Sequence, residues 1–147
     1  MRDRKRKSFA RHWPWCVLPG ALLGCATPVA PPAPPSGGTA LHLDYATFAG
    51  AVEPIHIEHG CDAGGDCHGG GIRGTLQLSP QTAKDTLFDF HQVSLQVTSN
   101  APDQSPILTA PLAVSSGGTA HSVKVFADTN DTEWRAIRAW VRAGVSP

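Results

Sequence analysis

A stretch of thirteen residues, positions 56–68, concentrates the side chains of this chain that could do chemistry. It reads HIEHGCDAGGDCH and holds three histidines and two cysteines. Cys67 is followed directly by His68, and a second cysteine, Cys61, stands upstream across a five-residue spacer. Thiols and imidazoles are nucleophiles and good metal ligands, so three kinds of chemistry compete for this stretch.

The first interpretation is covalent attachment of haem c. The usual pattern is C-x-x-C-H, in which each thiol joins one vinyl edge of the porphyrin and the adjacent histidine turns under the ring to the iron. Cys61, Cys67 and His68 match this pattern except for the longer spacer. Gly64 and Gly65 let the spacer bulge outward with little strain, because glycine accepts backbone angles that other residues avoid.

Two other interpretations remain open on the residues alone. A disulfide between Cys61 and Cys67 is common in exported proteins, but it gives His68 no role. A zinc or copper site is the third interpretation, although free thiolates are readily oxidised outside the cytoplasm. The residues available to such a site are His56, His59, Cys61, Cys67 and His68.

An amphipathic helix is predicted directly before the motif, over residues 45–59. Its apolar side chains recur at spacings of three and four, which places them on one face, and Asp44 is suited to cap the first turn. This face consists of Tyr45, Phe48, Val52 and Ile55. Pro54 falls inside the pattern, so we expect a kink or an early end in the last turn.

A second amphipathic helix is predicted near the C-terminus. Asp131 and its threonine neighbours are suited to cap it, and Gly144 is suited to end it. Its apolar face consists of Trp134, Ile137, Trp140 and Val141. Between the two helices we expect short helices over residues 81–90 and 105–112, and extended segments over residues 76–78 and 93–97. These elements predict a small all-α domain with long loops.

The first 24 residues have the features of an export signal peptide. Six Lys or Arg against one Asp precede a short apolar stretch, which is interrupted by two prolines and is too short to span a bilayer. The sequence LLGC at positions 22–25 resembles the lipobox of bacterial lipoproteins. That resemblance implies acylation of Cys25 and a lipid anchor in the membrane. Because Ala26 follows, it favours the periplasmic face of the outer membrane.

Removal of the signal changes the charge of the chain. The whole sequence has 12 basic and 12 acidic side chains, but residues 25–147 keep six basic against eleven acidic, a net charge of −5. This balance argues against nucleic acid as a partner, because nucleic-acid binding needs basic patches. Residues 25–40 contain the lipidated cysteine and a proline-rich tether, and residues 41–147 are predicted to form one domain.

In the order of its motifs the domain resembles the small cytochrome c-like domains of planctomycete and myxobacterial lipoproteins, which are similar to class I cytochromes c. The shared pattern is a helix ending near V-x-P-I, a C-spacer-C-H-G segment, a G-x-L-x-L segment, a Ser-Pro helix start, a histidine and a closing W-[IV]-x-x-G helix. The residues that carry it are Phe48, Val52, Pro54, Ile55, Cys61, Cys67, His68, Gly69, Gly74, Leu76, Leu78, Ser105, Pro106, Ile107, Leu108, His121, Trp140, Val141 and Gly144. They span nearly the whole domain, and longer cysteine spacers also occur in that family.

The resemblance implies the all-α cytochrome c fold, in which the first and last helices cross, here with Phe48 and Trp140 sized to pack at the crossing. It implies one covalent haem c held through Cys61 and Cys67, with His68 as the proximal iron ligand. The function that follows is one-electron transfer with redox partner proteins. No catalytic triad, carboxylate pair or phosphate-binding loop is visible in the sequence, so we expect an electron carrier and not an enzyme.

Methionine cannot be the second axial ligand of the exported protein, because the only methionine is Met1. The family often places a histidine in the loop before the last helix, which makes His121 the candidate distal ligand and His91 the second choice. We expect His56 and His59, close to the attachment motif, to lie on the wrong side of the ring. Two histidine ligands are expected to give a lower reduction potential than a histidine–methionine pair.

Overall fold

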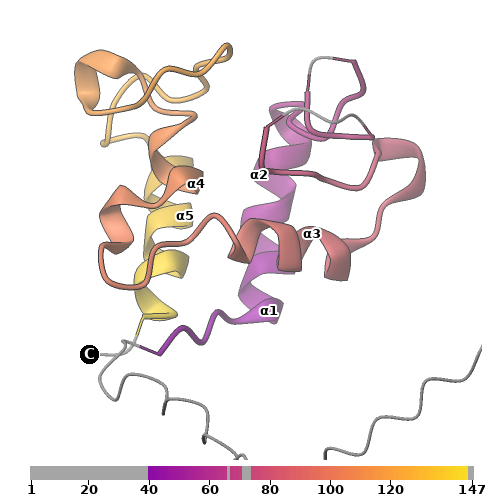
Figure 1. The fold of residues 1–147 in the computed structure, drawn as a ribbon, viewed down its shortest axis with the longest axis horizontal. Helices are drawn as coiled ribbons and strands as arrows, with labels where there is room; N and C mark the ends of the chain where they lie inside the picture. Colours follow the sequence, from indigo (N-terminus) through magenta and orange to yellow (C-terminus); the bar gives the residue numbers. More distant parts are fainter. Residues whose placement is uncertain (1–39, 66, 71–73, 146–147) are drawn as a thin grey trace, which may run out of the picture. The chain divides into compact units, whose positions relative to one another are not determined.

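The computed structural model describes residues 40–65, 67–70 and 74–145. The predicted export signal, Cys25 and the tether up to residue 39 lie outside the described residues. Within them the domain is mostly helical, with four helices and no sheet (Figure 1). A continuous first helix consists of α1 (Tyr45–Thr47), a π-helical turn (Phe48–Val52) and α2 (Glu53–Glu58), and it is followed by α3 (Thr86–Ser94), α4 (Pro106–Thr109) and α5 (Thr132–Ala143). Three-residue 3-10 turns lie at Gln81–Ala83, Pro102–Gln104 and Val114–Ser116. No described helix has the length and apolar character needed to cross a bilayer.

The first helix begins where the sequence predicts and continues through its proline. Asp44 caps it by accepting a hydrogen bond from the amide of Thr47 at 2.7 Å. The irregularity lies before Pro54, in the π-helical turn, and Pro54 itself stands in the first turn of α2. Proline has no N–H to donate, and its ring presses on the carbonyl four residues back, so the preceding turn widens. The expected early end is therefore wrong, and the helix runs to Glu58.

The last helix, α5, is capped as predicted and is tied to the start of the domain. Asp131 accepts hydrogen bonds from two amides of the first turn, at 2.9 and 3.1 Å. At the other end, the Gly144 carbonyl accepts a hydrogen bond from the amide of His42 at 2.7 Å. A Cβ at Gly144 would lie 2.5 Å from a methyl carbon of Leu43, so the close approach of the two segments needs glycine there.

The contact between the first helix and α5 forms the centre of the core. The ring centroids of Phe48 and Trp140 are 5.5 Å apart, and the Trp140 indole N–H donates to Asp44 O at 2.9 Å. The predicted contact between these two aromatic residues is confirmed. The buried apolar side chains are Phe48, Val52, Ile55, Leu78, Val93, Ile107, Leu108, Leu112, Phe126, Trp134, Ile137, Trp140 and Val141. Figure 1 shows the loop after α2 and the loop before α5 at the same end of the domain.

The middle of the chain differs from the prediction in three places. The helix expected over residues 81–90 starts late, because Gln81–Ala83 form a 3-10 turn and Asp85 caps α3 by accepting from the amide of Phe88 at 3.0 Å. The extended segment expected over residues 93–97 is wrong, since Val93 is fully buried as part of α3. The helix expected at 105–112 does start at Pro106, but it is only about one turn long.

Candidate functional site

A cavity of about 440 Å³ opens between two loops, which we call the cysteine loop (residues 60–70) and the His121 loop (residues 113–125). Both motif cysteines line it, as do His68 and His121. Much of the remaining wall is apolar and includes Ile55, Leu76, Ile107, Val125, Phe126 and Ile137. The structure therefore brings the four residues singled out from the sequence to one cavity, although they come from distant parts of the chain.

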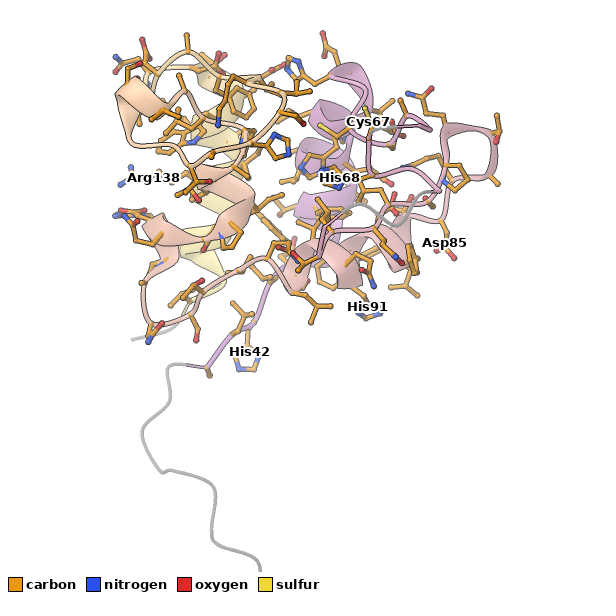
Figure 2. The ribbon with its side chains drawn as sticks, turned by 45° about the horizontal axis from the view of Figure 1, so that its top comes forward. His42, Cys67, His68, Asp85, His91 and Arg138 are labelled. Carbon is orange, nitrogen blue, oxygen red and sulfur yellow. The ribbon has the colours of Figure 1, made fainter. Side chains whose placement is uncertain are left out.

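His68 is held in place by its own backbone and by one side-chain hydrogen bond. Its amide donates to Cys61 O, and its carbonyl accepts from Leu78 N, both at 2.9 Å. Its Nδ1 donates to Leu76 O at 3.0 Å, so in the neutral imidazole Nε2 is the nitrogen available as a ligand. Metal-bound histidines commonly have such a carbonyl partner, which fixes the ring orientation. Figure 2 shows His68 beside Cys67.

His121 has a matching arrangement on the opposite loop. Its Nδ1 lies 2.6 Å from Val123 O and 3.3 Å from Val123 N. The shorter contact is to a carbonyl, which can only accept, so Nδ1 is the donor and Nε2 is also available in the neutral ring. The ring centroids of His68 and His121 are 5.9 Å apart, and the two ring planes differ by 18°. Two imidazoles that bind one metal ion from opposite sides, with metal–nitrogen bonds of about 2 Å, have centroids roughly 6 Å apart. The centroid distance of this stacked pair is therefore close to the value for two imidazoles that bind one ion.

Each of the two loops contains a glycine packed directly against a backbone carbonyl. A Cβ on Gly69 would lie 1.6 Å from Asp62 O, and a Cβ on Gly118 would lie 1.9 Å from Leu112 O. Any larger residue would push the loop away from the carbonyl that it covers. These two close approaches fix the paths of the loops that carry the histidines.

Cys61 and Cys67 are both free thiols and both half-buried. Burial raises the pKa of the Cys61 thiol to about 11, and the neighbouring Asp62 and Cys67 add to the shift. Cys61 is therefore protonated at neutral pH. Both sulfurs belong to residues that line the same cavity as His68, so a single bound group can meet all three side chains.

The spacer between the cysteines is anchored from inside by a residue that sequence analysis did not single out. Asp62 is fully buried, accepts a hydrogen bond from Gln81 Nε2 at 2.9 Å and lies 3.1 Å from Lys84 Nζ. Gly60 and Gly65 have positive φ angles of 64° and 77°, which turn the chain on either side of this anchor. One aspartate in a glycine-rich spacer was too weak a signal to identify it in advance.

The other candidate histidines are engaged differently. His59 Nε2 lies 2.6 Å from Glu133 Oε2, in the first turn of α5. His56 is buried and lines the cavity, and burial lowers its pKa to about 4. His91, the second choice for the distal ligand, lies on α3, away from Cys67 (Figure 2) and outside the cavity lining.

Among the described residues, no group of three or more His, Cys, Asp or Glu side chains is arranged to hold a metal ion. The five residues considered for zinc or copper are thus not gathered as one ligand set in that part of the chain. The cavity instead offers one imidazole on each of two opposing loops, with two thiols beside the first. Comparison of the chain with models of protein families, with curated proteins and with solved structures found no match.

Proposed function

We propose that residues 41–147 form a c-type cytochrome domain that carries one covalent haem and transfers single electrons. The observation that carries the proposal is the pair of facing imidazoles, His68 and His121, at a cavity that both motif cysteines also line. Covalent haem with two protein ligands needs this combination: a nitrogen for each face of the ring, thiols at its edge and apolar walls.

The size and character of the cavity suit a porphyrin. Cavities that bury most of a small ligand enclose roughly 300–1,000 Å³ and have mainly apolar walls with a few polar groups. This one encloses about 440 Å³, and Thr75, Gln96 and Ser122 supply polar groups on its wall. A flat, mostly apolar ring with a charged edge matches such a lining.

Each functional residue has a defined role in this proposal. Cys61 and Cys67 form the thioether bonds, His68 is the proximal ligand and His121 is the distal ligand. The Leu76 carbonyl orients His68 and makes its Nε2 more basic, and a second carbonyl does the same for His121. When bound, haem supplies a one-electron redox change at its iron. Two imidazole ligands favour a lower reduction potential than a histidine–methionine pair.

The packing of the helices supports a cytochrome c-like fold. The first helix and α5 meet through Phe48 and Trp140, the pair expected at the crossing of the first and last helices in class I cytochromes c. The proximal residue His68 follows the first helix, and the distal residue His121 precedes α5, which is the order that the resemblance implies.

The proposal extends to the location and partners of the domain. Residues 1–24 direct export, Cys25 carries the lipid, and the proline-rich tether holds the domain at the periplasmic face of the outer membrane. The partners are redox proteins with basic docking faces, because residues 25–147 carry six basic against eleven acidic side chains. Nucleic-acid binding and enzymatic turnover are not part of the proposed function.

Production of the full chain in bacteria that have a cytochrome c maturation system tests the proposal. We expect a red protein with one haem per chain that stays attached in denaturant. Cys67→Ala is expected to abolish stable attachment, whereas His91→Ala, outside the cavity, is expected to keep it. A colourless protein with Cys61 and Cys67 joined in a disulfide contradicts the proposal. It would indicate a disulfide-bonded lipoprotein without haem. Stoichiometric zinc or copper without haem contradicts it equally and indicates a metal-binding lipoprotein.

A further inference from the structure

A buried cluster of charged side chains lies beside α2 and the cysteine loop. Glu53, Asp62 and Asp89 are only 6%, 0% and 1% exposed, and all three carboxylates approach one ammonium group. That group is Lys84 Nζ, which lies 2.5 Å from Asp89 Oδ2, 3.1 Å from Asp62 Oδ2 and 3.8 Å from Glu53 Oε1. Three carboxylates around one cation leave two negative charges in excess, and a buried site holds such excess only at a high free-energy cost.

Glu53 is the member of this cluster with the weakest support for a negative charge. Asp89 accepts hydrogen bonds from the amide and the hydroxyl of Ser79, at 2.5 and 2.9 Å. Asp62 accepts one from a glutamine side chain and lies nearer to Lys84. Glu53 Oε1 is buried without a hydrogen-bond partner and is the farthest from the ammonium group. A hydrogen bond between the Glu53 side chain and Thr86 favours the charged form, but the effect of burial is larger. Burial accordingly raises the pKa of Glu53.

Three polar atoms in this region are buried without a hydrogen-bond partner among the described residues: Glu53 Oε1, His56 Nδ1 and Asp62 Oδ2. Asp62 Oδ2 still has its ion-pair contact with Lys84. A proton on Glu53 would turn its carboxylate into a hydrogen-bond donor and would remove one of the two excess charges. The cluster can therefore bind one proton, because the proton supplies a hydrogen-bond donor and lowers the excess negative charge by one.

His56 connects the cluster to the cavity. It lies one turn after Glu53 on α2, is 6% exposed and lines the cavity wall. Asp89, Lys84 and Asp62 of the cluster act electrostatically on His56, and so does His68. Because burial lowers the pKa of His56 to about 4, its ring is neutral at neutral pH. His56 therefore carries no charge that would weaken the electrostatic interaction between the cluster and the haem proposed at His68. Such interactions are strong in buried surroundings.

We propose that Glu53 is a proton-binding site coupled to electron transfer, which gains one proton when the cavity site gains one electron. The inference rests on the proposed function, because it needs a redox-active iron in the cavity. The balance is one electron from a donor protein to ferric iron and one proton from water to the Glu53 carboxylate, so the domain keeps its net charge; oxidation reverses both transfers. Lys84 and Asp89 are the charged groups that act directly on Glu53, and a hydrogen bond with Thr86 also lowers its proton affinity. Asp62 shares the same ammonium group.

Redox titration of the haem-loaded protein at several pH values, from about pH 5 to about pH 8, tests the coupling. The midpoint potential is expected to fall as pH rises while Glu53 titrates, with a limiting slope of about 59 mV per tenfold change in proton concentration for one proton per electron. Glu53→Gln keeps the size and polarity of the side chain but cannot gain a proton, so it loses this slope. Glu58→Gln is the matched control, because Glu58 lies on the exposed side of the same helix, and this variant keeps the slope.

Infrared redox-difference spectroscopy gives a second readout that also works on the wild-type protein alone. A carboxylic acid C=O band is expected to appear on reduction in the wild type and in Glu58→Gln, and to be absent from Glu53→Gln. A potential that is independent of pH, or a slope that Glu53→Gln retains, overturns the assignment of Glu53 while the haem remains bound. A protein that never binds haem contradicts the proposed function instead, so the two failures are distinguishable.

Discussion

His68 and His121 present nearly parallel imidazole rings to one cavity, with centroids 5.9 Å apart, although they stand on different loops. Each Nδ1 donates to a backbone carbonyl, at 3.0 and 2.6 Å, which restrains both rings. Side chains that are held in their binding orientation before the ligand arrives need little reorganisation on binding. If the proposed cytochrome holds its iron through these two rings, they would need little reorganisation to bind it.

Replacement of His121 by alanine is expected to leave the haem attached and to remove its sixth ligand. In the proposed cytochrome, attachment depends on Cys61 and Cys67 in the other loop, so the amount of covalent haem should stay near the wild-type amount. The visible spectrum should change from low spin to high spin, and added imidazole should restore the low-spin form. His91→Ala controls for loss of a histidine outside the cavity and should not alter the spectrum. An unchanged spectrum in His121→Ala would show that another residue is the sixth ligand.

Gly69→Ala is expected to destabilise the cysteine loop, because the new Cβ would lie 1.6 Å from Asp62 O. Overpacking of this kind costs about 1–3 kcal/mol of the free energy of unfolding. Gly50→Ala is the matched control, since its Cβ meets no atom within 4 Å and the site is helical. That change should be neutral or stabilise by up to about 1 kcal/mol. Urea denaturation of both variants measures the difference, and equal stabilities would contradict the proposed packing role of Gly69.

Helix ends were predictable from the sequence because capping depends on residues within one turn. Asp44 and Asp131 both cap the helices that they were expected to cap. The apolar spacing placed Phe48 and Trp140 on the apolar faces of their helices, and the resemblance to cytochromes c implied that these faces meet. The start of α3 was missed, because its cap, Asp85, stands in a segment where several residues could begin a helix with equal local preference.

The site was predictable only in its chemistry-bearing side chains. Cys61, Cys67, His68 and His121 were all named from the sequence, and the structure brings them to one cavity. The carbonyl of Leu76 could not be named, because every residue has a carbonyl and only the fold decides which one meets His68. The cluster around Lys84 was equally hidden, since its carboxylates come from α2, the cysteine loop and α3 and meet only after tertiary packing.

Asp103 is expected to make stability depend on pH in the acidic range. It accepts hydrogen bonds from the guanidinium groups of Arg142 and Arg138 on α5, and these hold its pKa well below its usual value. The stabilisation is therefore present above the unfolded pKa of about 4 and is lost as pH falls towards the lower folded pKa. Because the pair is partly exposed, Asp103→Asn should cost only about 1 kcal/mol at neutral pH and low salt.

The test for Asp103 compares urea denaturation of the wild type and of Asp103→Asn at neutral pH, at about pH 2, and in high salt. The difference between the proteins should shrink on acidification and on addition of salt. Asp128→Asn serves as the control, because the Asp128 side chain accepts a hydrogen bond from a nearby amide and contacts no arginine in the described part of the domain. A loss of stability in Asp103→Asn that is the same at every pH would indicate a packing effect and exclude the ion pair as its cause.

His56 is expected to destabilise the domain as the pH falls from about 6.5 to about 4. The first number is the pKa of a free imidazole, and the second is the pKa of His56 in the folded protein. In this range the unfolded chain binds a proton on His56 and the folded chain does not, so acidification favours unfolding. The raised pKa of Glu53 acts in the opposite direction, because a proton bound more tightly in the folded state stabilises it at low pH. The dependence of the free energy of unfolding on pH is therefore the sum of two opposing contributions, from His56 and from Glu53. Variants of each residue separate these contributions.

His56→Gln removes the titrating group and keeps hydrogen-bonding capacity, so its stability should fall less steeply between about pH 6.5 and about pH 4 than that of the wild type. Any packing loss in this variant is the same at every pH and does not change the slope. His91→Gln changes an exposed residue of α3 that lies outside the cavity, and this variant should keep the wild-type slope. Unfolding midpoints in urea at several pH values give the three slopes. Parallel curves for the wild type and His56→Gln would mean that the folded and unfolded chains bind a proton on His56 equally, so that burial does not lower its pKa.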